Sequence, residues 1–150
     1  VADESLVLLA DAASTAFWSV DNAGVKAGDT VVILGCGPVG LLAQKFAWLK
    51  GAKRVIAVDY IKYRLQHAKR ANKVEIVNFE DHENCGEYLK EITKGGADVV
   101  IDCVGMSGKM TPLEFLATGL KLQGGALGGL VIASQAVRKG GTIQVTGVYG

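Results

Sequence analysis

The sequence has little of several features that mark specialised classes of protein. Its 150 residues include only two prolines and three cysteines, and 16 basic residues nearly balance 15 acidic ones. A chain so close to neutral carries no strong field for a nucleic acid or a membrane surface, so we expect neither as a partner. No apolar run approaches the roughly 20 residues of a membrane span. No signal-peptide pattern is present either.

The few cysteines also limit the setting of the protein. Cys36, Cys85 and Cys103 form no CxxC pair, and an odd number argues against a disulfide framework. We therefore expect a reducing cytoplasm. The Cys36 thiol would lie at the start of a helix, where thiolates are stabilised, but a small residue that fills a turn is the simpler interpretation. We expect Cys85 and Cys103 to be inert.

Hydrophobic residues and glycine are abundant, at 49% and 20 residues. Short apolar runs alternate with helical patterns, which is typical of β-α-β units. The pattern predicts an α/β fold with a doubly wound parallel sheet, the Rossmann dinucleotide-binding fold. The predicted strands are 30–34, 54–59, 74–79, 97–103 and 142–147. The predicted helices are 38–50, 61–71, 84–93 and 127–138, with one or two helical turns in 1–22 and a loop over 105–125 that has a short helix opening at Thr111.

The first strand runs into a glycine-rich turn, G-C-G-P-V-G, that opens a helix. The start of a helix has unpaired N–H groups and the positive end of the dipole, and a phosphate satisfies both. Gly35 allows the tight turn, Gly37 lets a pyrophosphate approach the backbone, and Gly40 lets the helix pack on the strand. Pro38 suits the first helical position. We expect these residues and Val39 to bind a dinucleotide.

Asp59 follows Gly40 by nineteen residues, at the end of the second predicted strand. A carboxylate at this place accepts hydrogen bonds from the adenosine ribose and repels a 2′-phosphate, which favours NAD over NADP. Arg64 is a second candidate, which would cover the ribose or add to a positive field for the phosphates. The alternatives are an ordinary strand-end aspartate and a solvated helix arginine.

Two further strand ends face the carboxyl edge of the predicted sheet, where ligands bind in open α/β folds. The small and apolar residues there suit a wall for the ribose and nicotinamide rings, although ordinary loop packing explains them equally well. The candidates are Val104, Gly105, Thr146, Gly147 and Val148.

Four motifs in order resemble the medium-chain zinc-dependent alcohol dehydrogenases, over nearly the whole chain. They are the glycine turn, R-V-I-A-V-D, A-D-V-V-I-D-C-V-G and the closing A-V-R-K-G-G-T-I-Q-V-T-G-V-Y-G. The segment D-E-S-L-V-L-L-A-D-A-A-S-T-A-F-W-S-V resembles the formaldehyde dehydrogenase branch. The resemblance implies an oxidoreductase that transfers a hydride between an alcohol or aldehyde and NAD, as a dimer or tetramer.

The same resemblance implies that the chain is the coenzyme-binding part of a longer enzyme. Residues 1–22 would lead from a preceding catalytic domain, and 23–150 would form the NAD-binding domain. The absence of an initiator Met agrees with this expectation.

The family places a zinc-site residue four positions before a threonine that lies near the nicotinamide. In this sequence those positions are Asp11 and Thr15. The resemblance therefore implies Asp11 as a zinc ligand, with a helix-capping aspartate as the alternative, and Thr15 as a residue of the catalytic site. The usual Gly-Tyr after the threonine is Ala16-Phe17 here, which alters the local contact. Catalytic zinc needs about three protein ligands, so we expect the chain alone to be inactive.

Two other functions stay open at this point. The L-G-C-G-P segment also resembles the first motif of S-adenosylmethionine-dependent methyltransferases, although Ile33 occupies the position where those proteins usually carry an acidic residue. A non-catalytic NAD-sensing module is the other alternative, because fold does not fix function.

Overall fold

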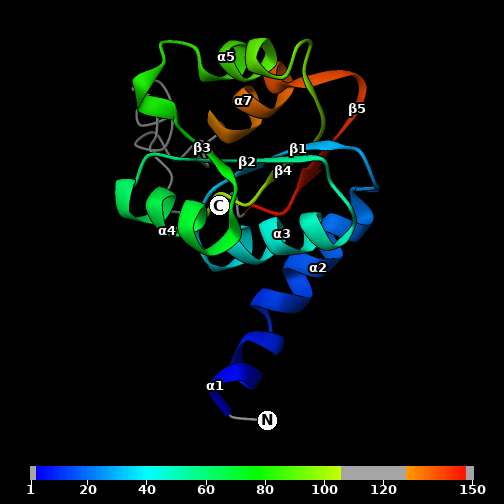
Figure 1. Ribbon diagram of the computed structural model, residues 1–150, viewed down its shortest axis with the longest axis vertical. Coiled ribbons are helices and arrows are strands. Elements are labelled where there is room, and N and C mark those ends of the chain that lie inside the picture. The colour runs from blue at the N-terminus through cyan, green and yellow to red at the C-terminus, as the bar shows by residue number, and fades with distance from the viewer. Residues whose placement is uncertain (1–2, 106–127, 148–150) are drawn as a thin grey trace, which may run out of the picture.

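The computed structural model describes residues 3–105 and 128–147, and within them five parallel strands form one sheet. The strand order is β3-β2-β1-β4-β5, so the chain winds outward in both directions from β1 (Figure 1). This order confirms the predicted doubly wound α/β fold. The strands are β1 Thr30–Leu34, β2 Arg54–Asp59, β3 Glu75–Asn78, β4 Ala97–Asp102 and β5 Val137–Val145. The helices are α1 Asp3–Leu6, α2 Ala12–Asn22, α3 Pro38–Leu49, α4 Lys62–Asn72, α5 Cys85–Ile92 and α7 Gly128–Ala136, with short 3-10 helices η1 Val7–Leu9 and η2 Phe79–Asp81.

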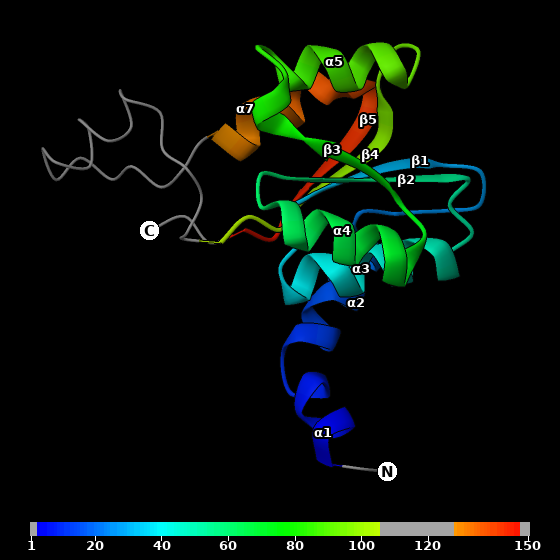
Figure 2. The same cartoon turned by 60° about the vertical axis from the view of Figure 1, so that its left-hand side comes forward.

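Helices cover both faces of the sheet. Helices α2, α3 and α4 lie on one face and α5 and α7 on the other (Figures 1 and 2). In β1, Val31 and Ile33 join the core on the first face, while Val32 and Leu34 join the core on the second. All four are at most 2% exposed. Continuous apolar strands are therefore required here, because neither face meets water.

The N-terminal segment is more helical than the one or two turns that the sequence predicts. Helix α2 alone has 11 residues. Ala16 and Val20 on it are completely buried in the core that α2 shares with α3. Helix α1 lies beyond α2, away from the sheet (Figure 2). Small residues at helical spacing allow α2 to lie close to α3, and that packing stabilises the helix.

The last strand begins earlier than the predicted 142–147, and the helix before it ends two residues before the predicted 138. Strand β5 starts at Val137, with an irregular register where Ala97 and Val99 of β4 meet it. Gly140 has a φ of +71°, which allows the irregular backbone. Arg138 also donates to Asp98 at 2.7 Å, an ion pair that fixes the start of β5 beside β4.

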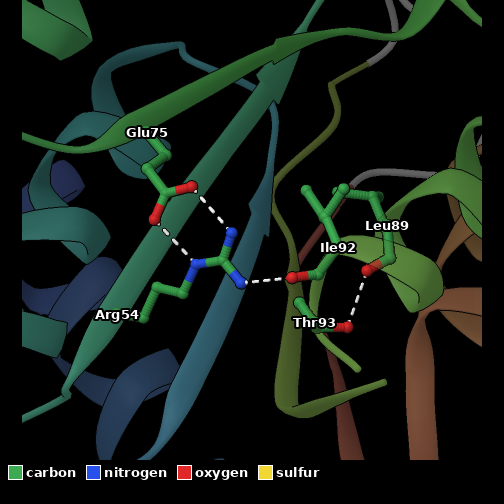
Figure 3. A network of polar contacts seen from close by, with 5 residues as sticks. All are labelled: Arg54, Glu75, Leu89, Ile92 and Thr93. Atoms are coloured by element: carbon green, nitrogen blue, oxygen red, sulfur yellow. Dashed lines mark hydrogen bonds and ion pairs between the residues drawn. The ribbon is translucent and has the colours of Figure 1, made fainter. Parts of the chain in front are cut away.

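An Arg54-centred network ties three elements together at the amino edge of the sheet (Figure 3). The Arg54 guanidinium donates to both carboxylate oxygens of Glu75, at 2.7 and 2.8 Å. It also donates to the carbonyl of Ile92 at 2.6 Å. The network lies at the starts of β2 and β3, so it stabilises the edge opposite the candidate site.

Two regions named in the sequence predictions lie outside the described residues: the greater part of the 105–125 loop with its helix at Thr111, and Val148. Among the helices that the structure describes, none has the length and apolar character needed to cross a bilayer.

Candidate functional site: the glycine turn and strand ends at the carboxyl edge of the sheet

Two glycines of the turn after β1 are required by the protein's own packing. Gly35 has a φ of +91°, and its amide donates to the carbonyl of Val58 at 2.8 Å. A Cβ there would lie 2.9 Å from the carbonyl oxygen of Cys103. A Cβ on Gly40 would lie 2.0 Å from the carbonyl oxygen of Gly35. Neither position has room for a side chain, so both glycines hold the turn against β2 and β4.

Gly37 differs from the other two, because a Cβ there would meet none of the described residues within 4 Å. Its φ of −76° and ψ of −175° are open to any residue. Gly37 is the N-cap of α3, and no side chain caps this helix end. The first intrahelical bond runs from the Leu41 amide to the Gly37 carbonyl, so the earlier amides of Val39 and Gly40 have no partner within the helix. The turn thus places open space beside free donors, an arrangement that suits a diphosphate.

Asp59 lies at the end of β2 with its carboxylate against the glycine turn. Its side chain is 6% exposed. One oxygen accepts from the Cys36 amide at 2.8 Å, and the other accepts from the amides of Tyr60 at 2.7 Å and Ile61 at 2.9 Å. A carboxylate offers about four lone-pair sites. The oxygen that faces Cys36 therefore accepts one hydrogen bond and keeps one further lone pair.

The thiol of Cys36 is buried beside Asp59 at the start of α3. Cys36 is 1% exposed, and burial first and the charge of Asp59 second raise its pKa to about 12. Burial likewise raises the pKa of Cys103 to about 12 and that of Cys85 to about 11. Burial and a raised pKa disfavour the thiolate, so they agree with the interpretation of Cys36 as a small residue that fills a turn.

Arg64 lies in the first turn of α4 and is half-buried. Its Nε donates to the Tyr63 hydroxyl at 3.3 Å. This hydrogen bond is the main cause that raises the pKa of Arg64, and the negative charge of Asp59 is a weaker one. The guanidinium is thus a permanent positive charge at the same edge of the sheet, and it interacts electrostatically with Asp59.

Asp102, which the sequence analysis did not single out, organises the two other strand ends. Its carbonyl oxygen accepts from the amides of Thr146 at 2.9 Å and Gly147 at 2.8 Å. Its carboxylate accepts from the amide of Val104 at 3.0 Å. Asp102 is fully buried, its second carboxylate oxygen has no partner within the described part of the chain, and burial raises its pKa. Beyond it, Gly105 is exposed, and a Cβ there would meet nothing within 4 Å in the described part of the chain. An acidic residue at the end of an otherwise apolar strand was the available signal.

The predicted Asp11 and Thr15 lie together at the start of α2. The Thr15 hydroxyl donates to a carboxylate oxygen of Asp11 at 2.9 Å, and the Thr15 amide donates to the Asp11 carbonyl at 2.8 Å. Asp11 is exposed and occupies the N-cap position, but its side chain caps no backbone amide. Its second oxygen has no recorded hydrogen bond among the described residues.

Zinc needs more ligands than this pair supplies. Within 3–105 and 128–147, no three His, Cys, Asp or Glu residues lie close enough to hold a metal ion. The described residues therefore do not form a zinc site, and Asp11 offers at most one carboxylate to one.

The comparisons with known proteins identify the family of the chain. Residues 38–122 match the model of the zinc-binding dehydrogenase family, which is more than half of the chain. The chain therefore belongs to the zinc-binding dehydrogenases, as the resemblance in its motifs indicates, and not to the methyltransferases.

Individual proteins similar to this chain are also named as dehydrogenases. The chain is 81% identical, over 99% of its length, to the zinc-type alcohol dehydrogenase-like protein AdhB of Bacillus subtilis, and it covers 39% of that protein. It is 36% identical to the glutathione-independent formaldehyde dehydrogenase of the same organism, over 96% of this chain and 33% of that one. A zinc-binding dehydrogenase structure from Sinorhizobium meliloti 1021, bound to NADP, matches with a TM-score of 0.70 and 25% identity. That match covers 91% of this chain and 34% of the other. The chain thus spans less than two-fifths of these relatives.

Proposed function

We propose that the chain is the NAD-binding part of a zinc-dependent alcohol dehydrogenase, which transfers a hydride between an alcohol or aldehyde and NAD. Two neighbouring features carry the proposal. Gly37 lacks a side chain although the packing of the protein leaves room for one, and the carboxylate of Asp59 is buried beside it. The free helix amides bind the diphosphate, and Asp59 accepts a hydrogen bond from the adenosine ribose.

The choice of NAD over NADP rests on Asp59. Its remaining lone-pair site suits a ribose hydroxyl, which donates a hydrogen bond. A 2′-phosphate at the same place would bring negative charge against a buried carboxylate. The nearby Arg64 offsets part of that repulsion. The Sinorhizobium relative was solved with NADP, so this preference is the first property to measure.

The nicotinamide end of the coenzyme lies, in this proposal, between the loops after β4 and β5. Val104 and Gly105 form one wall, and Thr146 and Gly147 form the other; Val148, the remaining sequence candidate, lies outside the described residues. The buried Asp102 joins both walls through its side chain and its carbonyl oxygen. This shared anchor keeps the space between the two loops constant, which the hydride donor requires.

The metal enters the proposal through Asp11 alone. Bound zinc would polarise an alcohol oxygen and lower its pKa. Asp11 supplies one ligand, the other ligands lie outside the described residues, and Thr15 holds the Asp11 carboxylate in place beside the nicotinamide. We propose a small alcohol or aldehyde as substrate, a dimer or tetramer as the assembly and the cytoplasm as the location.

Titration calorimetry with NAD and NADP tests the coenzyme assignment. We expect wild type to bind NAD at least about ten-fold more tightly than NADP, and Asp59→Gly to lose that preference. Because Asp59 also holds the Cys36 amide, unfolding is measured in parallel. Asp29→Gly is the matched control, because Asp29 is also buried and accepts a backbone amide, that of Lys26 at 3.0 Å, away from the proposed coenzyme site.

The control should keep the preference for NAD whatever stability it loses. Equal affinity of wild type for the two coenzymes would show that the interpretation of Asp59 is wrong. If wild type bound neither, the whole coenzyme proposal would fail.

The metal assignment has a separate test in a longer protein that contains this chain. Asp11→Ala should lower its zinc content, measured by atomic absorption, because the site loses an oxygen ligand. The control is Asp21→Ala, an exposed aspartate on the same helix that has no part in the proposed site. Unchanged zinc content in the Asp11 variant would contradict the assignment.

A further inference from the structure

Helix α2 and the end of strand β5 are joined by a hydrogen bond between residues far apart in the sequence. The Thr146 hydroxyl donates to the Ser19 hydroxyl oxygen at 2.8 Å. The Ser19 hydroxyl in turn donates to the carbonyl of Thr15 at 2.7 Å. Ser19 is fully buried, so no water can replace either bond in the folded protein.

Both ends of this connection meet the candidate site. On one side, the hydroxyl of Thr15 donates to Asp11. On the other side, the Thr146 amide donates to the carbonyl of Asp102, which also anchors the loop after β4. An unbroken series of contacts therefore runs from Asp11 through Thr15, Ser19 and Thr146 to Asp102.

We propose that Ser19 is a positioning residue for the coenzyme, because its hydroxyl holds Thr146 in one orientation against α2. The inference rests on the proposed function, which makes this edge of the sheet an NAD site. The backbone bond to Asp102 fixes where Thr146 lies, but it does not fix the side chain. The bond to Ser19 selects one rotamer and uses the single hydroxyl proton of Thr146, so that side chain can only accept hydrogen bonds from a coenzyme.

The same connection sets the proposed coenzyme wall relative to Asp11 and Thr15. Helix α2 carries that pair at its start and Ser19 one turn later. Loss of the Ser19–Thr146 bond would leave α2 attached to β5 at a different point, where Asn22 donates to Gln144 at 2.7 Å. Gln144 lies within β5, two residues before Thr146. The Asn22 contact thus joins the same two elements without touching the proposed coenzyme walls.

Calorimetric titration of the chain with NADH tests the inference. Thr146→Val removes the hydroxyl and keeps the shape, and Ser19→Ala removes the acceptor. Each should weaken NADH affinity about three- to ten-fold, the range expected for one hydrogen bond. The double variant should bind no more weakly than either single variant, because both changes remove the same bond. Thr146→Ser restores the hydroxyl and should bind within about two-fold of wild type.

Asn22→Ala is the matched control for a loss of stability. It should lower the midpoint of unfolding and leave NADH affinity unchanged. The inference is overturned if Thr146→Val and Ser19→Ala bind NADH like wild type, or if Asn22→Ala weakens binding as much as they do. Wild type that binds no NADH would overturn the proposed function as well, whereas wild-type binding with unaffected variants overturns this inference alone.

Discussion

At the scale of single residues, the three glycines of the G-x-G-x-x-G turn are glycine for different physical reasons. Gly35 and Gly40 have no room for a side chain because backbone atoms lie within 2.9 and 2.0 Å of where a Cβ would be. Gly37 has that room and an ordinary backbone conformation. The fold explains the first two glycines, whereas the third has its explanation in the proposed approach of a diphosphate.

This difference predicts opposite behaviour of two alanine variants. Gly37→Ala should lower the free energy of unfolding by no more than about 1 kcal/mol, because its methyl enters open space and only the preference of an N-cap for glycine over alanine is lost. It should weaken NAD binding at least about ten-fold, because that space is where the diphosphate must approach. Gly40→Ala should lose about 1–3 kcal/mol or more of stability, because the methyl overlaps the Gly35 carbonyl. Denaturant unfolding and calorimetry measure the two quantities.

A Gly37→Ala protein that is strongly destabilised, or that binds NAD like wild type, would contradict this interpretation of the turn. Gly24→Ala provides a control for glycine replacement itself. Gly24 also has open space around its Cβ position but a φ of +71°, so it should lose stability from backbone strain without losing coenzyme affinity.

The sequence predicts most residues of the candidate site but not the hydrogen bonds that hold them in place. Spacing alone predicts that Asp59 lies near the glycine turn, because it ends the strand after the turn. That its carboxylate already binds three backbone amides depends on how β1 and β2 pair. Asp102 was missed because its role depends on Thr146 and Gly147, more than 40 residues away in the sequence.

At the scale of elements, Arg54 is the clearest connection between neighbours. It forms a two-pronged ion pair from β2 to Glu75 at the start of β3 and also donates to the last residue of α5, Ile92 (Figure 3). The hydrogen bond from Arg54 is the main cause that lowers the pKa of Glu75. Because that pKa is lower in the folded than in the unfolded chain, the pair stabilises the fold at neutral pH and is lost as pH falls through the folded pKa.

Glu75→Gln should therefore lower the free energy of unfolding at pH 7 by less than about 1 kcal/mol, since the Glu75 side chain is 53% exposed and water screens the pair. The difference from wild type should shrink steadily below about pH 4.5 and vanish in stronger acid, where the glutamate of wild type is also neutral. Chemical unfolding at several pH values measures it. A difference that grows on acidification would contradict the assigned role of the pair.

The bounds of helices and strands were predicted best where neighbouring residues in the sequence determine them. Strands β1 and β2 and helix α3 have the predicted bounds to within a residue, because apolar runs stop at glycine, proline or aspartate. The predicted start of β5 was wrong because Arg138 and Lys139 are typical of the last turn of a helix. Pairing of Arg138 with Asp98 on β4 decides this segment instead, and no local pattern contains that pairing.

At the scale of the whole molecule, the proposed coenzyme would contact segments that the fold brings together from four strand ends. The glycine turn follows β1, Asp59 ends β2, and the walls follow β4 and β5. A ligand that bridges all four must add to the stability of the entire sheet, because global unfolding separates every one of its contacts.

Thermal unfolding provides the corresponding prediction. NADH at one hundred times its dissociation constant should add about 2.7 kcal/mol to the free energy of unfolding, which for a chain of this size raises Tm by about 5–10 °C. Gly37→Ala at the same NADH concentration is the control, because it keeps the wild-type fold and loses the diphosphate contact, so its Tm should rise by less than half as much. Differential scanning calorimetry records both proteins directly. An equal rise for wild type and Gly37→Ala would mean that NADH stabilises the chain at another place, and the glycine turn would then have to be explained without a coenzyme.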